Sequence, residues 1–222
     1  MTFALSTNWC NGRLSSGEEI ADLALALGFD ALELGFRTTE EQVAGFRRRL
    51  DRMPVRSVHA FCPVPLSAPF GHPELYSLAT PDLEAARMAR LQIVRNIEFT
   101  AGIGADALVL HAGRVPCASW FKSRRQPKRL RNGRRVLELF KPRLAELVPI
   151  LEKNGVTLGL ENLPYLEGFP NEAEMEELAG PWVKPWFDTG HDYVRRMTLA
   201  LACPQPKEVL GLHVNDSTGG DD

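Results

Sequence analysis

The sequence lacks the features that mark secreted, membrane-spanning and dinucleotide-binding proteins. Its four cysteines are scattered without a CxxC pair, and no charged-then-apolar leader precedes the first predicted strand, so we expect a protein of the reducing cytoplasm. No apolar run approaches the ~18 residues needed to cross a bilayer, which argues against an integral membrane protein. No glycine-rich loop follows the first predicted strand, where the sequence reads STNWCNG, and this argues against a dinucleotide-binding sheet.

An excess of charge of one sign is also absent. The chain of 222 residues carries 26 Lys and Arg against 28 Asp and Glu, and a net charge of -2 gives no overall attraction to nucleic acid or to an anionic membrane. Hydrophobic residues make up 44% and charged residues 24%, as in ordinary globular domains. We therefore expect a single domain over residues 1–222, although a complete eight-unit α/β barrel usually takes about 250 residues.

Short apolar runs alternate with helical patterns along the whole chain. Seven such runs predict buried parallel strands, at residues 3–6, 31–34, 55–61, 107–112, 157–162, 183–189 and 209–215. Helices are predicted between them: one capped by Ser16 and ended by Gly28, one over 39–52, one from Pro81 to about 103, and one over 134–154 that Pro142 and Pro149 kink or split. Such alternation predicts either a closed barrel or a doubly wound open sheet.

Polar side chains fall where the predicted strands end. Successive members are separated by 26, 52, 50, 27 and 25 residues, as expected if each step spans one βα unit and two units carry long loops, at 62–80 and 114–133. Active sites of parallel barrels lie on the face where strands end. The members of this set are Glu33, His59, His111, Glu161, Asp188 and His213.

An eighth unit would begin about 25 residues after His213, beyond the last residue given. We therefore expect a barrel truncated after its seventh strand. An open parallel edge is a liability, so we expect another element to cover it, and a second copy of the chain in a homo-oligomer would serve.

Four ligand-type side chains end the runs ALVLHAG, TLGLE, WFD and LGLHV. They are His111, Glu161, Asp188 and His213, and imidazole together with carboxylate suits Zn, Mn, Co or Fe better than Ca. A single such histidine is more often a hydrogen-bonded core residue. Buried carboxylates, however, are costly unless a cation compensates them, so the set as a whole predicts a metal site.

Three motifs in fixed order resemble a known superfamily. GLENLPY (residues 159–165), FDTGHDY (187–193) and LHVNDS (212–217), with SVHAFCP and LVLHAGR upstream, are similar to strands three to seven of the xylose-isomerase-like superfamily. That superfamily contains sugar isomerases and epimerases and also abasic-site nucleases of the endonuclease-IV type. The resemblance implies a (β/α)8 TIM barrel.

The isomerase pattern implies that Glu161, Asp188 and His213 hold one divalent ion, Mn, Mg, Co or Zn. The fourth ligand of that pattern is a glutamate on strand eight, which lies outside this sequence. The resemblance implies that Glu161 also takes a proton from the carbon next to a metal-polarised carbonyl. It also implies that His191 contacts a substrate oxygen as a second catalytic residue. The alternative for His191 is a solvent-facing residue at a helix N-terminus.

The nuclease pattern implies a multinuclear zinc site instead. It adds His59, His111 and His191 as ligands, and an Asp-x-His that Asp221 could begin. A third interpretation is a non-catalytic, truncated barrel that binds metal or a partner. These three alternatives stay open at the level of sequence.

The expected substrate is a small sugar or sugar phosphate, and nucleic acid is the less favoured partner. Glu33, Asn162 and Trp9 are candidate substrate-binding residues beside His191, although Glu33 could instead pair with Arg37 and Trp9 could simply pack. A basic segment at 122–135, beside Trp120 and Phe121, could hold a phosphate or stack on a base. The alternative is a solvated loop that leads into a helix.

Overall fold

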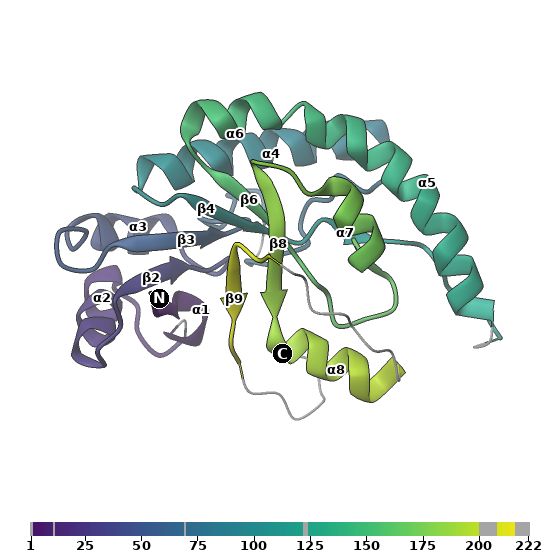
Figure 1. Ribbon diagram of the computed structural model, residues 1–222. Helices are drawn as coiled ribbons and strands as arrows, with labels where there is room; N and C mark the ends of the chain where they lie inside the picture. Colours follow the sequence, from purple (N-terminus) through teal and green to yellow (C-terminus); the bar gives the residue numbers. More distant parts are fainter. Residues whose placement is uncertain (1, 11, 69, 122–123, 200–207, 216–222) are drawn as a thin grey trace.

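Seven parallel strands form one curled sheet, a half-barrel (Figure 1). The computed structural model describes residues 2–10, 12–68, 70–121, 124–199 and 208–215. The sheet order is β1-β2-β3-β4-β6-β8-β9, so β1 and β9 form its two edges. The strands are β1 (Ala4–Ser6), β2 (Ala31–Leu34), β3 (Val55–His59), β4 (Ala107–Leu110), β6 (Thr157–Glu161), β8 (Val183–Asp188) and β9 (Gly211–His213). All seven predicted strands are confirmed, each within its predicted run.

The predicted helices are present, with corrected ends. Ser16 caps α2 (Gly17–Ala26) and Thr39 caps α3 (Glu40–Arg47), which ends five residues earlier than predicted. The third helix, α4 (Leu83–Gly102), does not begin at Pro81, because the carboxylate of Asp82 accepts a hydrogen bond from Ala85 N and makes Asp82 the N-cap. The fourth is split as predicted, into α5 (Arg125–Ala145) and α6 (Val148–Asn154).

The loop predicted over 114–133 is wrong in its second half, because α5 already begins at Arg125. Arg, Lys and Gln favour helix, and Arg129, Gly133, Val136 and Phe140 recur at helical spacing on its buried side. Sequence patterns also missed the short elements. These are α1 (Thr7–Cys10), α7 (Glu172–Leu178) and an antiparallel ribbon of β5 (Gly113–Arg114) with β7 (Gly168–Phe169). Helix α8 (Thr189–Leu199) was implied by one of the two alternatives for His191, without bounds.

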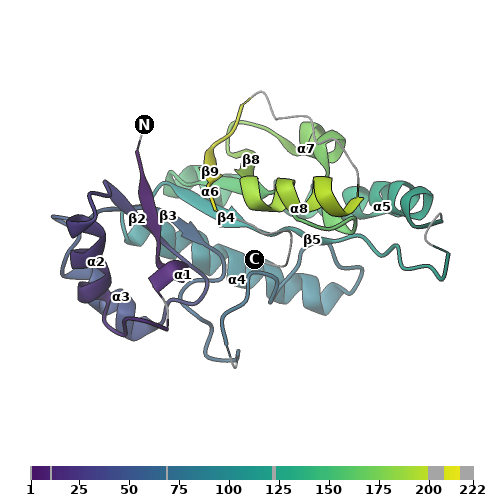
Figure 2. The ribbon, with the colours of Figure 1, turned by 90° about the horizontal axis from the view of Figure 1, so that it is seen from below.

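The two faces of the sheet bury different side chains, because successive residues of a strand point to opposite faces. On the outer face, Leu32, Val58, Leu108 and Leu158 join a core with apolar residues of α2 to α6. Figures 1 and 2 show α4, α5 and α6 along one side of the sheet and α2 and α3 beside its first strands. Among the described residues no helix has both the length and the apolar character that a bilayer span requires.

On the inner face a small apolar cluster is built around one large side chain. The indole of Trp186 packs with Ala107 and Val109, and it lies directly over Gly159 and Gly211. A Cβ atom at these glycines would come within 2.9 and 2.4 Å of the ring, so neither position accepts a larger residue without a shift. Trp186 therefore forms the floor beneath the ends of the strands.

Candidate metal centre

The polar residues predicted at the strand ends lie together at one rim of the half-barrel. Parallel strands end at the same edge of a sheet, so side chains up to 180 positions apart in sequence come into contact. We call the rim cluster the following set: Glu33, His59, His111, Glu161, Asp188, His191 and His213. Its members are buried or nearly so, and Glu161 is only 1% exposed.

Glu161, at the end of β6, is the hub of the rim cluster. Its Oε2 lies 3.0 Å from His59 Nε2 and 3.1 Å from His111 Nε2. Its Oε1 lies 3.0 Å from His213 Nδ1 and 3.4 Å from His191 Nδ1. Both oxygens of one buried carboxylate therefore face four imidazoles, which four separate elements contribute.

Asp188 ends β8 and is fixed by the helix that follows it. Its Oδ1 accepts a 2.7 Å hydrogen bond from the backbone N–H of His191, and its Oδ2 lies 3.5 Å from His213 Nδ1. Asn162 braces this region, because its side chain accepts from Asp188 N at 2.6 Å and donates to Asp188 O at 3.0 Å. The carbonyl of Asn162 lies 2.8 Å from His191 Nδ1.

Glu33 belongs to the same cluster rather than to a surface ion pair. Its Oε2 accepts from Ser57 Oγ at 2.9 Å and lies 3.0 Å from His213 Nε2. The alternative partner considered for Glu33, Arg37, instead lies over the ring of Phe36. Sequence reasoning missed Ser57, although its position two residues before His59 on an inward-facing strand could have revealed it.

Proximity shifts the ionisation of these groups. Burial opposes ionisation of Glu161, yet the imidazoles of His213 and His111 hold the pKa of its carboxyl well below the usual value. Burial also opposes charge on His213, but Glu33 and Glu161 raise its pKa well above the usual value. Burial lowers the pKa of His111 despite the neighbouring Glu161, which favours the neutral ring that a metal ion requires.

The donor set of the rim cluster fits a divalent ion. Two groups have ligand atoms that all lie within 4.8 Å of one another, His59–Glu161–His213 and Glu161–Asp188–His191, and they share Glu161. Nδ1 of His111 is buried and has no hydrogen-bond partner in the part of the chain that the structure describes. Imidazole and carboxylate ligands together suit Zn, Mn, Co or Fe. The structure thus brings together the predicted ligands that it describes, all except Asp221, and their role as ligands remains a prediction.

Of the predicted site residues, Asn162 lies beside the rim cluster at Asp188, and the structure places Trp9 outside it. The side chain of Trp9 is 51% exposed and carries Arg13 over its ring at 4.8 Å. Asp221 lies outside the described residues. In the basic segment, Lys122 also lies outside them, while Arg129 is buried against Glu174 and Arg134 pairs with Glu177, so part of that segment already has protein partners.

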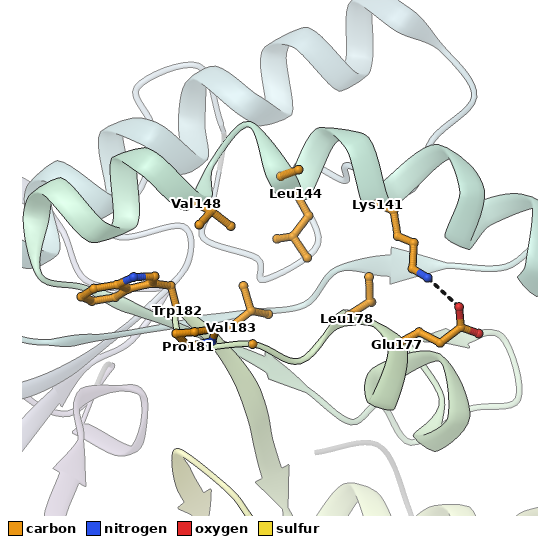
Figure 3. A pocket seen from close by; sticks show the side chains of 10 residues that line it. Lys141, Leu144, Val148, Glu177, Leu178, Pro181, Trp182 and Val183 are labelled. Atoms are coloured by element: carbon orange, nitrogen blue, oxygen red, sulfur yellow. Dashed lines mark hydrogen bonds and ion pairs between the residues drawn. The ribbon is translucent and has the colours of Figure 1, made fainter.

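A groove on the outer side of the molecule is separate from the rim. It lies between α5 and α6 and the segment that leads into β8, and the Lys141–Glu177 ion pair, 2.5 Å long, bridges it (Figure 3). Its walls are largely apolar, with Leu144, Val148 and Trp182 among them. No residue of the rim cluster lines this groove, so the chemistry-bearing side chains lie elsewhere.

A curled parallel α/β sheet with acidic and imidazole side chains gathered where its strands end defines the class of half-barrel to which this protein belongs. Within that class the chain is a member of the Xylose isomerase-like TIM barrel family, whose family model matches residues 21–222. The resemblance drawn from the three motifs is therefore confirmed. No curated protein matches the chain.

Solved structures share the fold at low sequence identity. A D-tagatose 3-epimerase-like protein is 21% identical with a TM-score of 0.68, over 100% of this chain and 78% of that one. The 3-keto-D-glucoside 4-epimerase YcjR from E. coli is 16% identical with a TM-score of 0.64, over 90% and 73% of the two chains. A Thermus thermophilus protein soaked with ZnCl2 is 22% identical with a TM-score of 0.60, over 100% and 80%. These likenesses establish the fold.

Proposed function

We propose that the chain is a divalent-metal-dependent isomerase or epimerase that acts on a sugar, a sugar phosphate or a related polyol ketone. The observation that carries the proposal is the buried hub at Glu161, which contacts four imidazoles, with Asp188 beside those of His213 and His191. The epimerases among the structures that share the fold support this reaction class. Three buried free cysteines, Cys10, Cys62 and Cys117, agree with the proposed location in the cytoplasm.

Glu161, Asp188 and His213 are the proposed metal ligands, with His59 and His111 beside them. When bound, a divalent ion supplies Lewis-acid stabilisation of negative charge that develops on a substrate oxygen. The carboxylate of Glu161 is the proposed base for the proton on the carbon next to the carbonyl, because its lowered pKa keeps it ionised at neutral pH.

The neighbouring side chains orient this machinery. The 2.8 Å contact between His191 Nδ1 and Asn162 O fixes the orientation of this ring, and His191 is the proposed contact for a substrate oxygen. Glu33, which accepts a hydrogen bond from Ser57, holds the ring of His213 from the other side. Trp186 closes the floor, so we expect substrate to enter from the loops beyond the strand ends.

Proton exchange tests the proposal directly. The protein, supplied in turn with Mn, Co, Mg or Zn, is incubated in D2O with a panel of ketoses, and deuterium at the carbon next to the carbonyl is followed by NMR. We expect exchange that Glu161→Gln lowers by about 10²- to 10⁴-fold and that Glu177→Gln, a surface control remote from the rim, leaves unchanged. Metal binding without exchange on any ketose would end this proposal.

A zinc-dependent phosphodiesterase acting at abasic sites in DNA is the second candidate. The observation that favours it is the pair of overlapping ligand groups that share Glu161, since a shared carboxylate can bridge two ions. Elemental analysis that finds several zinc ions per chain, with nicking of abasic duplex, would support it. One ion per chain and intact duplex would remove it, and an absence of both activities would support the non-catalytic interpretation.

A further inference from the structure

Connecting segments of three different βα units meet in one polar contact, which we call the rim wall: Glu74, Arg114, which lies on β5, and Tyr165. Arg114 donates from Nε and Nη2 to Glu74 Oε2 at 2.8 and 2.6 Å, and its guanidinium lies 4.0 Å from the centre of the Tyr165 ring. The hydroxyl of Tyr165 donates to the other carboxylate oxygen of Glu74. Neither the fold nor the proposed mechanism yet accounts for this arrangement.

The rim wall borders the rim cluster. Arg114 follows His111 by three residues and Tyr165 follows Glu161 by four, so both extend from strand ends that carry cluster residues. The loop that holds Glu74 is anchored beside them, because Ser77 Oγ donates to Ala112 O at 3.0 Å. Against the effect of burial, the imidazole of His111 helps Arg114 and Tyr165 to lower the pKa of the Glu74 carboxyl, which places the rim wall near the His111 side of the rim cluster.

The rim wall is polar, but the negative charge of Glu74 compensates the positive charge of Arg114. Burial opposes ionisation of Glu74, yet its bonds to Arg114 and Tyr165 hold the pKa of its carboxyl below the usual value, so it is an anion at neutral pH. The side chain of Arg114 is 54% exposed against 14% for Glu74. Among the described residues Nη1 of Arg114 forms no hydrogen bond, so this half-exposed guanidinium can still donate from Nη1.

We propose that Arg114 is a specificity-determining residue that donates hydrogen bonds to hydroxyl groups of an uncharged substrate, while Glu74 cancels the charge that would otherwise select a phosphorylated one. This inference rests on the proposed function, because it assigns the substrate class of the same site. A guanidinium freed from its carboxylate binds phosphate through charge-assisted hydrogen bonds, which are about twice as strong as neutral ones. The balance between the two substrate classes thus depends on Glu74.

Equilibrium binding separates this inference from catalysis. Isothermal titration of metal-depleted protein, in which no ion can itself bind phosphate, compares D-fructose with D-fructose 6-phosphate. We expect wild type to bind the phosphate ester no tighter than the free sugar, and Glu74→Gln to bind the ester at least about tenfold tighter than wild type does. The double variant Glu74→Gln/Arg114→Ala should lose that gain. Arg114→Ala alone should weaken binding of the free sugar.

Two controls separate charge from loosening of the loops. Tyr165→Phe removes the hydrogen bond to Glu74 and keeps the ion pair, so it should show no gain for the phosphate ester. Arg37→Ala removes an exposed arginine that lies 5.8 Å from the ring of Phe36, itself packed on His59. The inference would be overturned if wild type bound the phosphate ester more tightly than the free sugar and Arg37→Ala or Arg114→Ala abolished that preference. It would also be overturned if Glu74→Gln kept its melting temperature and showed no gain in affinity for the ester. Loss of proton exchange alone would bear only on the proposed function.

Discussion

Two buried polar clusters in this molecule differ in whether their charges are compensated within the protein. In the first, which we call the anchor, Arg129 binds both carboxylate oxygens of Glu174 at 2.8 Å and also donates to the carbonyls of Leu166 and Gly168. In the rim cluster, three carboxylates face imidazoles whose charge depends on protonation. The anchor is complete within the protein, whereas the rim cluster is suited to receive a cation.

The difference separates a cluster that stabilises the fold from one that is suited to bind. The anchor joins α5 to α7 and to the segment before β7, and Gly133 makes room for it, since a Cβ there would come within 2.2 Å of Arg129 Nη1 and Glu174 Oε1. Removing one partner of such a buried pair lowers the free energy of unfolding strongly, whereas replacing both partners by apolar residues changes it little. A cluster of ligands shows the reverse behaviour, because its cost falls when a metal ion binds.

Breaking the anchor should have the largest effect on stability. Arg129→Met leaves the carboxylate of Glu174 buried without its partner, and we expect the free energy of unfolding in urea to fall by about 3–5 kcal/mol. The double variant Arg129→Met/Glu174→Leu should recover most of that loss. Metal affinity of the folded fraction should not change. Equal losses in the single and double variants would show that the anchor does not act as an ion pair.

Changing the rim cluster should leave the fold intact and remove the metal. Asp188→Asn keeps the size of the side chain and an oxygen that can accept from His191 N, so metal-free stability should change little. Metal at 100 times its Kd should stabilise wild type by about 2.7 kcal/mol, and this increment should be lost in Asp188→Asn and kept in Arg129→Met. Differential scanning fluorimetry with Mn or Zn, against a chelator control, measures it. A full metal increment in Asp188→Asn would exclude Asp188 as a ligand.

The pH dependence of metal-free protein sharpens the same contrast. The pKa of Glu161 is lowered from 4.5, so its contribution to stability is present above that value and is lost as the pH falls. The pKa of His213 is raised from 6.5, so its contribution is complete below that value and is lost as the pH rises through the folded pKa. Melting temperatures in chelator should therefore decline above pH 6.5 in wild type and in Arg129→Met, but not in His213→Gln. Metal affinity should rise over the same range, because binding displaces the proton.

The smallest effect is expected on the surface. Glu177 forms ion pairs with Arg134 at 2.8 Å and with Lys141 at 2.5 Å. All three side chains are exposed, so solvent screens both pairs. We expect Glu177→Gln to shift the melting temperature by no more than about 2 °C and to leave metal binding unchanged. A loss as large as that of Arg129→Met would mean that burial does not decide the worth of ion pairs in this protein.

The sequence by itself determined the strands and the identities of the rim residues. Short apolar runs and the regular return of Glu, Asp and His at their ends depend on local pattern, so the ends of β2, β6 and β8 could be predicted to within one residue. Local capping determined α2 in the same way, through Ser16. The three motifs also identified the family.

Only the tertiary structure decided which partner each polar group found. The sequence allowed Glu33 to pair with Arg37, whereas the curled sheet brings it to His213, 180 positions away. Arg129 read as one cation of a basic loop, yet helix α5 turns it inward against Glu174. Glu74, Arg114 and Tyr165 carry no joint signal in the sequence. Contacts of this kind depend on strand order and loop path, which bring together residues that no local pattern relates.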